Sequence, residues 1–85
     1  MSEDIELLKK KIIYKSSYRG IKELDIILRS FVKKHINSLT INDLNDLFVF
    51  LDNRDEDIFK FKQGLVDEKK IKDNNISNLF KNFNF

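Results

Sequence analysis

The sequence predicts an all-α fold, a small single-domain bundle of four to five short helices. Apolar residues recur every three or four positions through most of the chain, as they do along one face of a helix. No segment alternates apolar and polar residues as a half-buried strand would, and no dipeptide signals a β-hairpin. The length of 85 residues suits one compact domain. We therefore expect a single unit over residues 1–85, with its first few residues and its tail from about residue 82 loose.

The first two predicted helices carry the clearest apolar stripes. The first covers about residues 4–16 and the second about residues 21–35. Their predicted core-facing side chains are Ile5, Leu8, Ile12, Ile21, Leu24, Leu28, Phe31 and Val32. A last helix is expected over about residues 71–83, where the polar residues 73–75 interrupt the apolar pattern.

Two shorter helices are predicted between these by their end signals. Thr40 suits an N-cap, with Asp43 three residues on, and the apolar pattern then continues to residue 51. A further helix begins at Asp55 or Asp57, and Gly64 is placed to end it in a left-handed cap.

The residue types present exclude several kinds of site. The chain has no cysteine, so disulfides, thiolate zinc sites and thiol catalysis are excluded. The single histidine, His35, cannot form a histidine metal site alone, and the carboxylates are scattered. The two glycines lie too far apart for a phosphate-binding loop. We therefore predict a protein that is not an enzyme, has no metal site and binds no cofactor stably.

Nothing in the sequence predicts insertion into a membrane or export. No run of about 18 apolar residues is present. The first ten residues mix acidic and basic side chains, and fit neither a secretory signal nor an acid-poor transit peptide. We therefore expect a cytoplasmic, bacterial protein with no membrane partner.

The charges are nearly balanced, with 16 basic and 14 acidic residues and a formal net charge of +2. A protein that works mainly by binding phosphate groups, as nucleic-acid-binding proteins do, carries a larger excess of basic residues. Lysines 9–11, with Lys15 and Arg19, form either a nucleic-acid patch or a solvated helix face, and the acidic residues close by favour the second. A helix-turn-helix is disfavoured because residues 42–53 carry aspartates and no lysine or arginine. We expect no nucleic-acid partner, and a generic helical interaction domain or DNA-binding regulatory domain is the alternative function.

One group of side chains is predicted to face away from the core around the connection between the first two helices. At about 100° per residue, the second helix places three residues opposite its apolar stripe: Arg19, Glu23 and Ile26. Tyr14 falls opposite the stripe of the first helix, Tyr18 lies in the connection, and Gly20 permits a close backbone approach or an unusual dihedral angle. This combination of residue types is typical of a protein–protein hot spot. Alternatively, Gly20 only serves the turn and Tyr14 packs on a neighbouring helix, and the residues alone leave both interpretations open.

Residues 11–25 resemble the signature of a known family. Their sequence, KIIYKSSYRGIKELD, is similar to that of the SdhE-type FAD assembly factors, also called the succinate dehydrogenase assembly factor 2 family. The hallmark of that family is Arg-Gly-x-x-Glu, usually followed by a hydrophobe and Asp. The resemblance covers about residues 10–65 and includes residues 55–61, where the family tends to have Asp-Pro-Asp-Leu, an aromatic, any residue and Trp. This chain departs from the pattern at Ser17, Glu56 and Phe61, and lacks the prolines that follow Gly64 in relatives.

The resemblance implies a function and a set of binding residues. Family members are small helical bundles that bind the flavoprotein subunit of succinate dehydrogenase, or in some bacteria of fumarate reductase, and promote covalent attachment of FAD to one of its histidines. The implied protein is an assembly chaperone, and FAD is the cofactor of its partner; we expect the free chain to be a monomer. Combined with the surface described above, the expected partner-binding residues are Tyr14, Tyr18, Arg19, Gly20, Glu23, Asp25 and Ile26. Secondary candidates are Lys11, Lys15, Asp57, Phe59 and Phe61.

Overall fold

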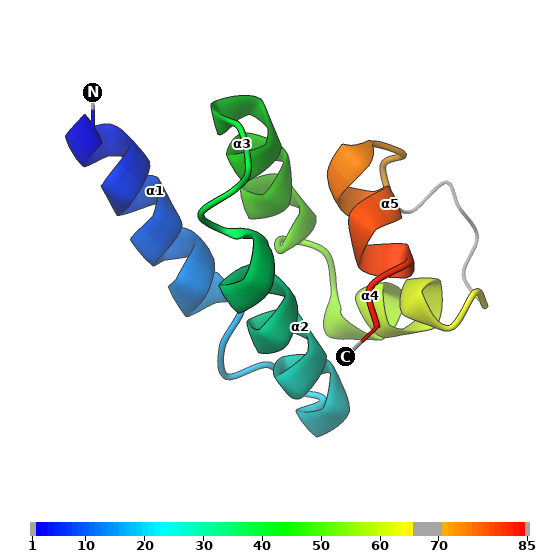
Figure 1. Cartoon of the computed structure of the whole chain (residues 1–85). Coiled ribbons are helices and arrows are strands. Elements are labelled where there is room, and N and C mark those ends of the chain that lie inside the picture. The colour runs from blue at the N-terminus through cyan, green and yellow to red at the C-terminus, as the bar shows by residue number, and fades with distance from the viewer. Residues whose placement is uncertain (1, 66–70, 85) are drawn as a thin grey trace.

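The computed structural model describes residues 2–65 and 71–84, which form helices joined by turns and loops (Figure 1). The helices are α1 (Ser2–Lys15), α2 (Lys22–His35), α3 (Ile41–Phe50), α4 (Asp55–Lys62) and α5 (Asn75–Lys81). No strand forms in this part of the chain, so the predicted all-α fold is confirmed. None of these described helices is long and apolar enough to cross a membrane.

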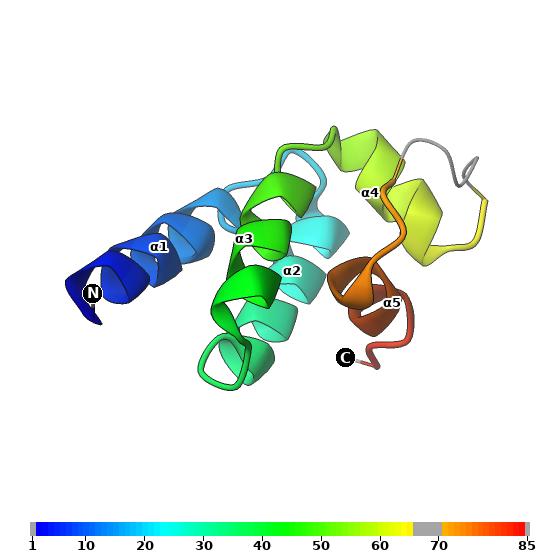
Figure 2. The same cartoon turned by 90° about the horizontal axis from the view of Figure 1, so that it is seen from above.

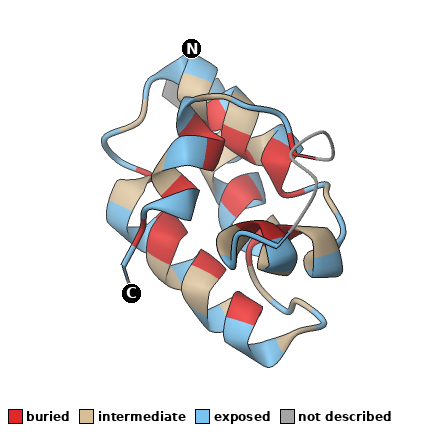
Figure 3. Ribbon diagram, turned by 90° about the vertical axis from the view of Figure 1, so that its right-hand side faces the viewer, coloured by how far each residue is buried: buried red, intermediate tan, exposed pale blue. Residues whose placement is uncertain are grey.

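Helix α3 lies between α1 on one side and α5 on the other (Figures 1 and 2). Helix α1 also packs against α2, and α4 packs against both α2 and α5. The domain extends 39 × 24 × 21 Å along its principal axes. In so small a domain each helix buries one side and leaves another in solvent, and Figure 3 shows buried and exposed residues alternating along the helices accordingly.

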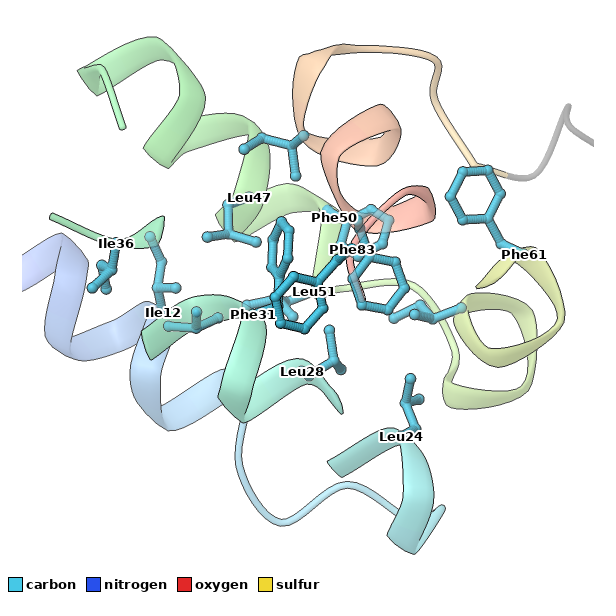
Figure 4. Close-up of a cluster of buried hydrophobic side chains, with 14 of the residues drawn as sticks. Ile12, Leu24, Leu28, Phe31, Ile36, Leu47, Phe50, Leu51, Phe61 and Phe83 are labelled. Atoms are coloured by element: carbon cyan, nitrogen blue, oxygen red, sulfur yellow. The ribbon is translucent and has the colours of Figure 1, made fainter. Parts of the chain in front are cut away.

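The core is built around phenylalanine rings. The ring of Phe31 on α2 packs edge-on against Phe80 of α5 and against Phe83, with centroid distances of 5.3 and 5.4 Å. Phe50 of α3 packs against Phe80 at 5.3 Å. Edge-to-face pairs such as the two made by Phe31 add about 0.5–1.5 kcal/mol each beyond the area they bury. Buried aliphatic side chains surround the rings, among them Ile12, Leu24, Leu28, Leu47 and Leu51 (Figure 4). The same cluster includes Leu44, Ile58, Ile71 and Ile76.

The ends of α3 and α4 agree with the predicted signals. The Thr40 hydroxyl caps α3 by accepting a hydrogen bond from the Asp43 N–H at 3.1 Å. Helix α4 begins at Asp55, the first of the two residues predicted to start it. Gly64 follows it with a φ of +75°, and the Leu65 N–H donates to the Lys60 carbonyl at 2.9 Å. This is the left-handed cap that the glycine predicted.

Helix α5 is shorter than the helix predicted over residues 71–83. The Asn74 side chain accepts a hydrogen bond from the Ser77 N–H, and the Ser77 hydroxyl accepts one from the Asn74 N–H, both at 2.9 Å. This capping box starts the helix at Asn75, so the residues before it form a loop. The tail from about residue 82, expected to be loose, is held at Phe83, which is buried against Phe31.

Lys62 of α4 holds the end of α5. Its ammonium group donates hydrogen bonds to the backbone carbonyls of Phe80 at 2.8 Å, of Lys81 at 3.1 Å, and of Phe83. A cation suits this end of a helix, where carbonyls lack intrahelical partners. Burial lowers the pKa of Lys62 below its usual 10.5.

Lys62→Met is expected to lower the free energy of unfolding by about 1–2 kcal/mol at neutral pH, because these carbonyls lose a charged donor. Since the pKa of Lys62 is lower in the folded state, the unfolded chain binds more protons as the pH approaches 10.5. The stability difference between wild type and variant should therefore widen as the pH rises toward 10.5. Urea denaturation across this range measures it, with Lys60→Met at an exposed position of α4 as the control. A difference that narrows with rising pH would contradict the lowered pKa.

Candidate partner-binding site

The connection between α1 and α2 lies against the turn between α3 and α4 (Figure 2). Helix α1 ends at Lys15 and α2 begins at Lys22, so residues 16–21 form the connection. Within it Tyr18 has a φ of +58°, and no other non-glycine residue among those described has a positive φ. This left-handed conformation costs a bulky residue on the order of 1 kcal/mol, which the surrounding contacts have to offset.

The side chain of Arg19 crosses from this connection to the α3–α4 turn and is only 11% exposed. Its Nη1 donates hydrogen bonds to the carbonyls of Lys15 at 2.8 Å and Leu51 at 3.1 Å, and Nη2 donates to the Asn53 carbonyl at 3.2 Å. Its Nε lies 2.7 Å from Oδ1 of Asp55, in an ion pair whose angle does not make it a hydrogen bond. The guanidinium therefore joins the ends of α1 and α3 to the start of α4.

Gly20 brings its backbone against the same carboxylate. Its N–H donates to Oδ2 of Asp55 at 2.6 Å. A Cβ at position 20 would lie 3.1 Å from that oxygen, so any larger residue would push the carboxylate away. The close approach that Gly20 permits is thus made by a side chain of this same chain, at the turn. We call the contacts of Arg19 and Gly20 with Asp55 the Asp55 clamp.

The structure places Arg19 differently from the sequence-based expectation. The helical spacing put Arg19 on the outer face of the second helix, beside Glu23. Because α2 begins only at Lys22, the progression of 100° per residue does not extend back to Arg19, whose guanidinium turns inward to Asp55. Glu23 stays exposed on α2. No spacing rule links positions as far apart as 19 and 55, so the sequence gives no direct signal for this contact.

Two aromatic side chains remain exposed beside the clamp, Tyr14 at 74% and Tyr18 at 87%. They border a shallow hollow of about 330 Å³ that is also lined by Lys15, Ser17, Arg19 and Asp55. Large amphipathic rings are enriched at protein–protein interfaces, where they supply most of the binding energy. We call this feature the tyrosine hollow, and it is the candidate partner-binding site.

The remaining predicted residues on α2 lie at different depths. Ile26 is exposed, like Glu23. Asp25 is half-buried, with Oδ2 3.8 Å from Nη1 of Arg29. Its Oδ1 is buried and has no hydrogen-bond partner among the described residues. The accessible part of this face therefore consists of Glu23 and Ile26.

The two basic secondary candidates lie on α1. Lys11 is exposed. Lys15 forms an ion pair with Asp52 and donates to the Phe48 carbonyl at 3.2 Å, and its ammonium lies 3.9 Å from the centroid of the Phe48 ring. These contacts tie Lys15 to α3, at the edge of the tyrosine hollow.

The secondary candidates on α4 lie mostly inside the domain. Phe61 is buried and its ring centroid is 6.5 Å from that of Phe50. Phe59 packs at the edge of the core, and Asp57 is half-buried. Phe61, at the position where the resemblance leads us to expect Trp, therefore acts here in packing. In the described ranges 2–65 and 71–84, no three His, Cys, Asp or Glu side chains gather as metal ligands would.

The fold and the site define a small all-α domain that presents an exposed aromatic hollow on an internally braced connection. A family model described as "Flavinator of succinate dehydrogenase" matches residues 10–84. The chain belongs to this family, and the membership predicted from residues 11–25 is confirmed.

Curated relatives of known name are consistent with this membership. A protein of Dictyostelium discoideum is 41% identical over 58 residues, which make up 68% of this chain and 41% of the relative. One of Meyerozyma guilliermondii is 40% identical over 57 residues, 67% of this chain and 42% of the relative. One of Culex quinquefasciatus is 30% identical over 82 residues, 94% of this chain and 52% of the relative. All three are named succinate dehydrogenase assembly factor 2, mitochondrial.

The chain thus spans about two fifths to one half of the length of these relatives. The expected cytoplasmic, bacterial location is contradicted, because the relatives come from eukaryotes and are named mitochondrial. That expectation rested on a missing targeting pattern in the first ten residues, which is no guide to location when a chain spans only part of its relatives. The comparison with solved structures found no match.

Proposed function

We propose that this chain binds the flavoprotein subunit of succinate dehydrogenase through the tyrosine hollow and the adjoining face of α2, and thereby promotes covalent attachment of FAD to that subunit. Membership of the flavinator family supports the choice of partner. The observation that carries the choice of surface is the exposure of Tyr14 and Tyr18, which line one hollow beside the hallmark residues Arg19 and Gly20. In this proposal FAD is the cofactor of the partner.

The hallmark residues divide into two roles. Arg19 and Gly20 hold the connection through the Asp55 clamp, while Glu23 is exposed. The Glu23 carboxylate is therefore available to accept charge-assisted hydrogen bonds from the partner, which become strong when the interface excludes water. Tyr14 and Tyr18 supply the aromatic anchors of the contact, and Ile26 adds apolar area.

Binding alone accounts for promotion of the attachment. The bond joins a histidine nitrogen of the flavoprotein to the flavin, and the two have to be held close together and correctly oriented, since small misplacements cost much of the rate. A protein that binds the competent arrangement of the flavoprotein more tightly than other arrangements raises its population. This role needs a rigid, complementary surface and no catalytic side chain.

The double variant Tyr14→Ala/Tyr18→Ala tests the surface. We expect the affinity for the purified flavoprotein to fall about 100-fold, because aromatic anchors in an interface contribute about 1–2 kcal/mol or more each. In-gel flavin fluorescence of the denatured flavoprotein should fall in parallel. Val49→Ala, an exposed apolar residue on α3, is the control and should bind like the wild type. Wild-type affinity of the double variant would contradict the proposed site.

Tyr18→Gly separates binding from folding. Glycine takes up the left-handed conformation of residue 18 without strain, and the Tyr18 side chain buries little surface in the free chain. The free energy of unfolding should therefore stay the same or rise by up to about 1 kcal/mol, while the affinity falls. A loss of binding in a variant of unimpaired stability has to come from the surface itself.

A further inference from the structure

Asp55 is the first residue of α4 and lines the tyrosine hollow together with the two exposed rings of Tyr14 and Tyr18. Both of its carboxylate oxygens are engaged within the chain, Oδ1 at 2.7 Å from Nε of Arg19 and Oδ2 at 2.6 Å from the N–H of Gly20. Its side chain is 25% exposed, so most of its surface faces these contacts. One carboxylate thus holds two successive residues of a connection that belongs to a different part of the chain.

We infer that Asp55 is the positioning residue of the tyrosine hollow: it orients Tyr18 toward the partner by clamping Arg19 and Gly20, the two residues that follow Tyr18. The inference rests on the proposed function, because it assigns a role within the same surface. Asp55 acts through Tyr18 and supplies little contact area of its own.

The first argument is that Asp55 is itself firmly placed. Helix α4 is anchored by the buried side chains of Ile58 and Phe61 and packs against α2 and α5. A carboxylate in the first turn of a helix interacts favourably with the positive end of the helix dipole, which adds to the stability of the start of α4. The clamp therefore ties the connection to a fixed element of the fold.

The second argument is the conformation of Tyr18. Its φ of +58° is unfavourable for a residue with a large side chain, so the connection would relax if it were free to do so. Holding Arg19 and Gly20 fixes the direction in which the chain leaves residue 18 and so prevents that relaxation. Without the clamp, the ring of Tyr18 would no longer be held in its position at the hollow.

Asp55→Asn and Asp52→Asn form a matched pair of variants in the same turn. The asparagine at position 55 keeps the shape of the side chain, but it removes the charge and leaves one oxygen for two partners. Asp52 is exposed, and its carboxylate pairs with Lys15. Asp52→Asn changes the net charge of the chain by the same amount and leaves the clamp intact.

The free chain tests the clamp without any partner. In Asp55→Asn we expect amide hydrogen exchange of Gly20 to be faster by about tenfold or more, while amides in the middle of α2 exchange as in the wild type. The coupling constant between the amide and α protons of Tyr18 should move away from its left-handed value. Asp52→Asn should change neither. Unchanged exchange at Gly20 in Asp55→Asn would overturn the inference, whether or not the flavoprotein binds.

A double-mutant cycle then distinguishes positioning from a merely structural role. We expect Asp55→Asn to lower the affinity for the purified succinate dehydrogenase flavoprotein about tenfold in the wild-type background. In the Tyr18→Ala background the same change should cost less than about twofold, because the ring that Asp55 orients is gone. Equal losses in both backgrounds would overturn the inference. Failure of the wild-type chain to bind would instead overturn the proposed function, while Gly20 exchange still decides on the clamp.

Discussion

Arg19→Met is expected to lower the free energy of unfolding by about 2–4 kcal/mol, a large part of the roughly 5–10 kcal/mol typical of a domain this small. The change removes the donor to the carbonyls of Lys15, Leu51 and Asn53 and leaves the Asp55 carboxylate without its ion pair. Most of this loss is the desolvation cost of carbonyl acceptors that stay buried without a donor. The melting temperature should fall by at least about 10 °C, as measured by circular dichroism.

Arg29→Met provides the matched control for this loss. Arg29 lies on the exposed side of α2, and its nearest carboxylate contact, to Asp25, is 3.8 Å long. A pair this long, whose arginine lies in solvent, contributes about 0–0.5 kcal/mol. If Arg19→Met were no less stable than Arg29→Met, the contacts of Arg19 across the α3–α4 turn would not brace the connection. The stability of Arg19→Lys should lie between those of Arg19→Met and Arg29→Met, since an ammonium keeps the charge but cannot reproduce the planar fork of the guanidinium.

The parts of the fold that the sequence predicts are those set by local rules. The stripes of the first two helices repeat every three or four residues, and their side chains lie in the core or at its edge, as Leu24 and Leu28 do. Thr40 and Gly64 cap their helices through hydrogen bonds to residues close by in the sequence, so their signals are also local. The start of α5 was misplaced because the apolar Ile71 fits the helical pattern but is buried from a loop. The burial of Phe83 depends on Phe31, a contact that no local rule contains.

The candidate site also contains some features that local rules predict and others that depend on the tertiary fold. The exposure of Glu23 and Ile26 follows from their angular position on the second helix, and the sequence predicts it. For Tyr14 the residues alone leave two interpretations open, and the structure shows it exposed. The inward turn of Arg19 does not follow, because it depends on where α2 begins and on an aspartate brought near by the fold. A hallmark read from sequence therefore marks this connection without separating the residues that hold it from those that are exposed.

This division has a consequence for any substitution in the hallmark. Loss of binding by a variant of Glu23 reports on the surface, because its side chain is exposed. Loss of binding by a variant of Arg19 reports on both the surface and the fold, since the same guanidinium lines the hollow and joins three helices. Binding measured together with stability separates the two effects, and neither measurement does so alone.

Gly20→Arg is expected to abolish binding to the flavoprotein and to lower the free energy of unfolding by about 1–2 kcal/mol. Its Cβ would lie 3.1 Å from Oδ2 of Asp55, so the carboxylate has to move and the hydrogen bond from the residue 20 N–H weakens. The new guanidinium also competes with Arg19 for Asp55, and its long side chain projects from an exposed position beside the hollow. Helical content should be largely retained, because residue 20 lies outside α1 and α2.

Gly20→Ala separates the crowding of Asp55 by a Cβ from the effects of the long arginine side chain. It adds the Cβ alone, and the carboxylate then has to shift by a few tenths of an ångström. We expect a cost of about 0.5–1 kcal/mol in the free energy of unfolding and an affinity that is reduced but still measurable. Pull-down of the flavoprotein and circular dichroism on all three chains make the comparison. Capture of the flavoprotein by Gly20→Arg at the wild-type level would show that the partner does not approach this connection, because a side chain of that length beside the hollow leaves no room for a protein seated on Tyr14 and Tyr18.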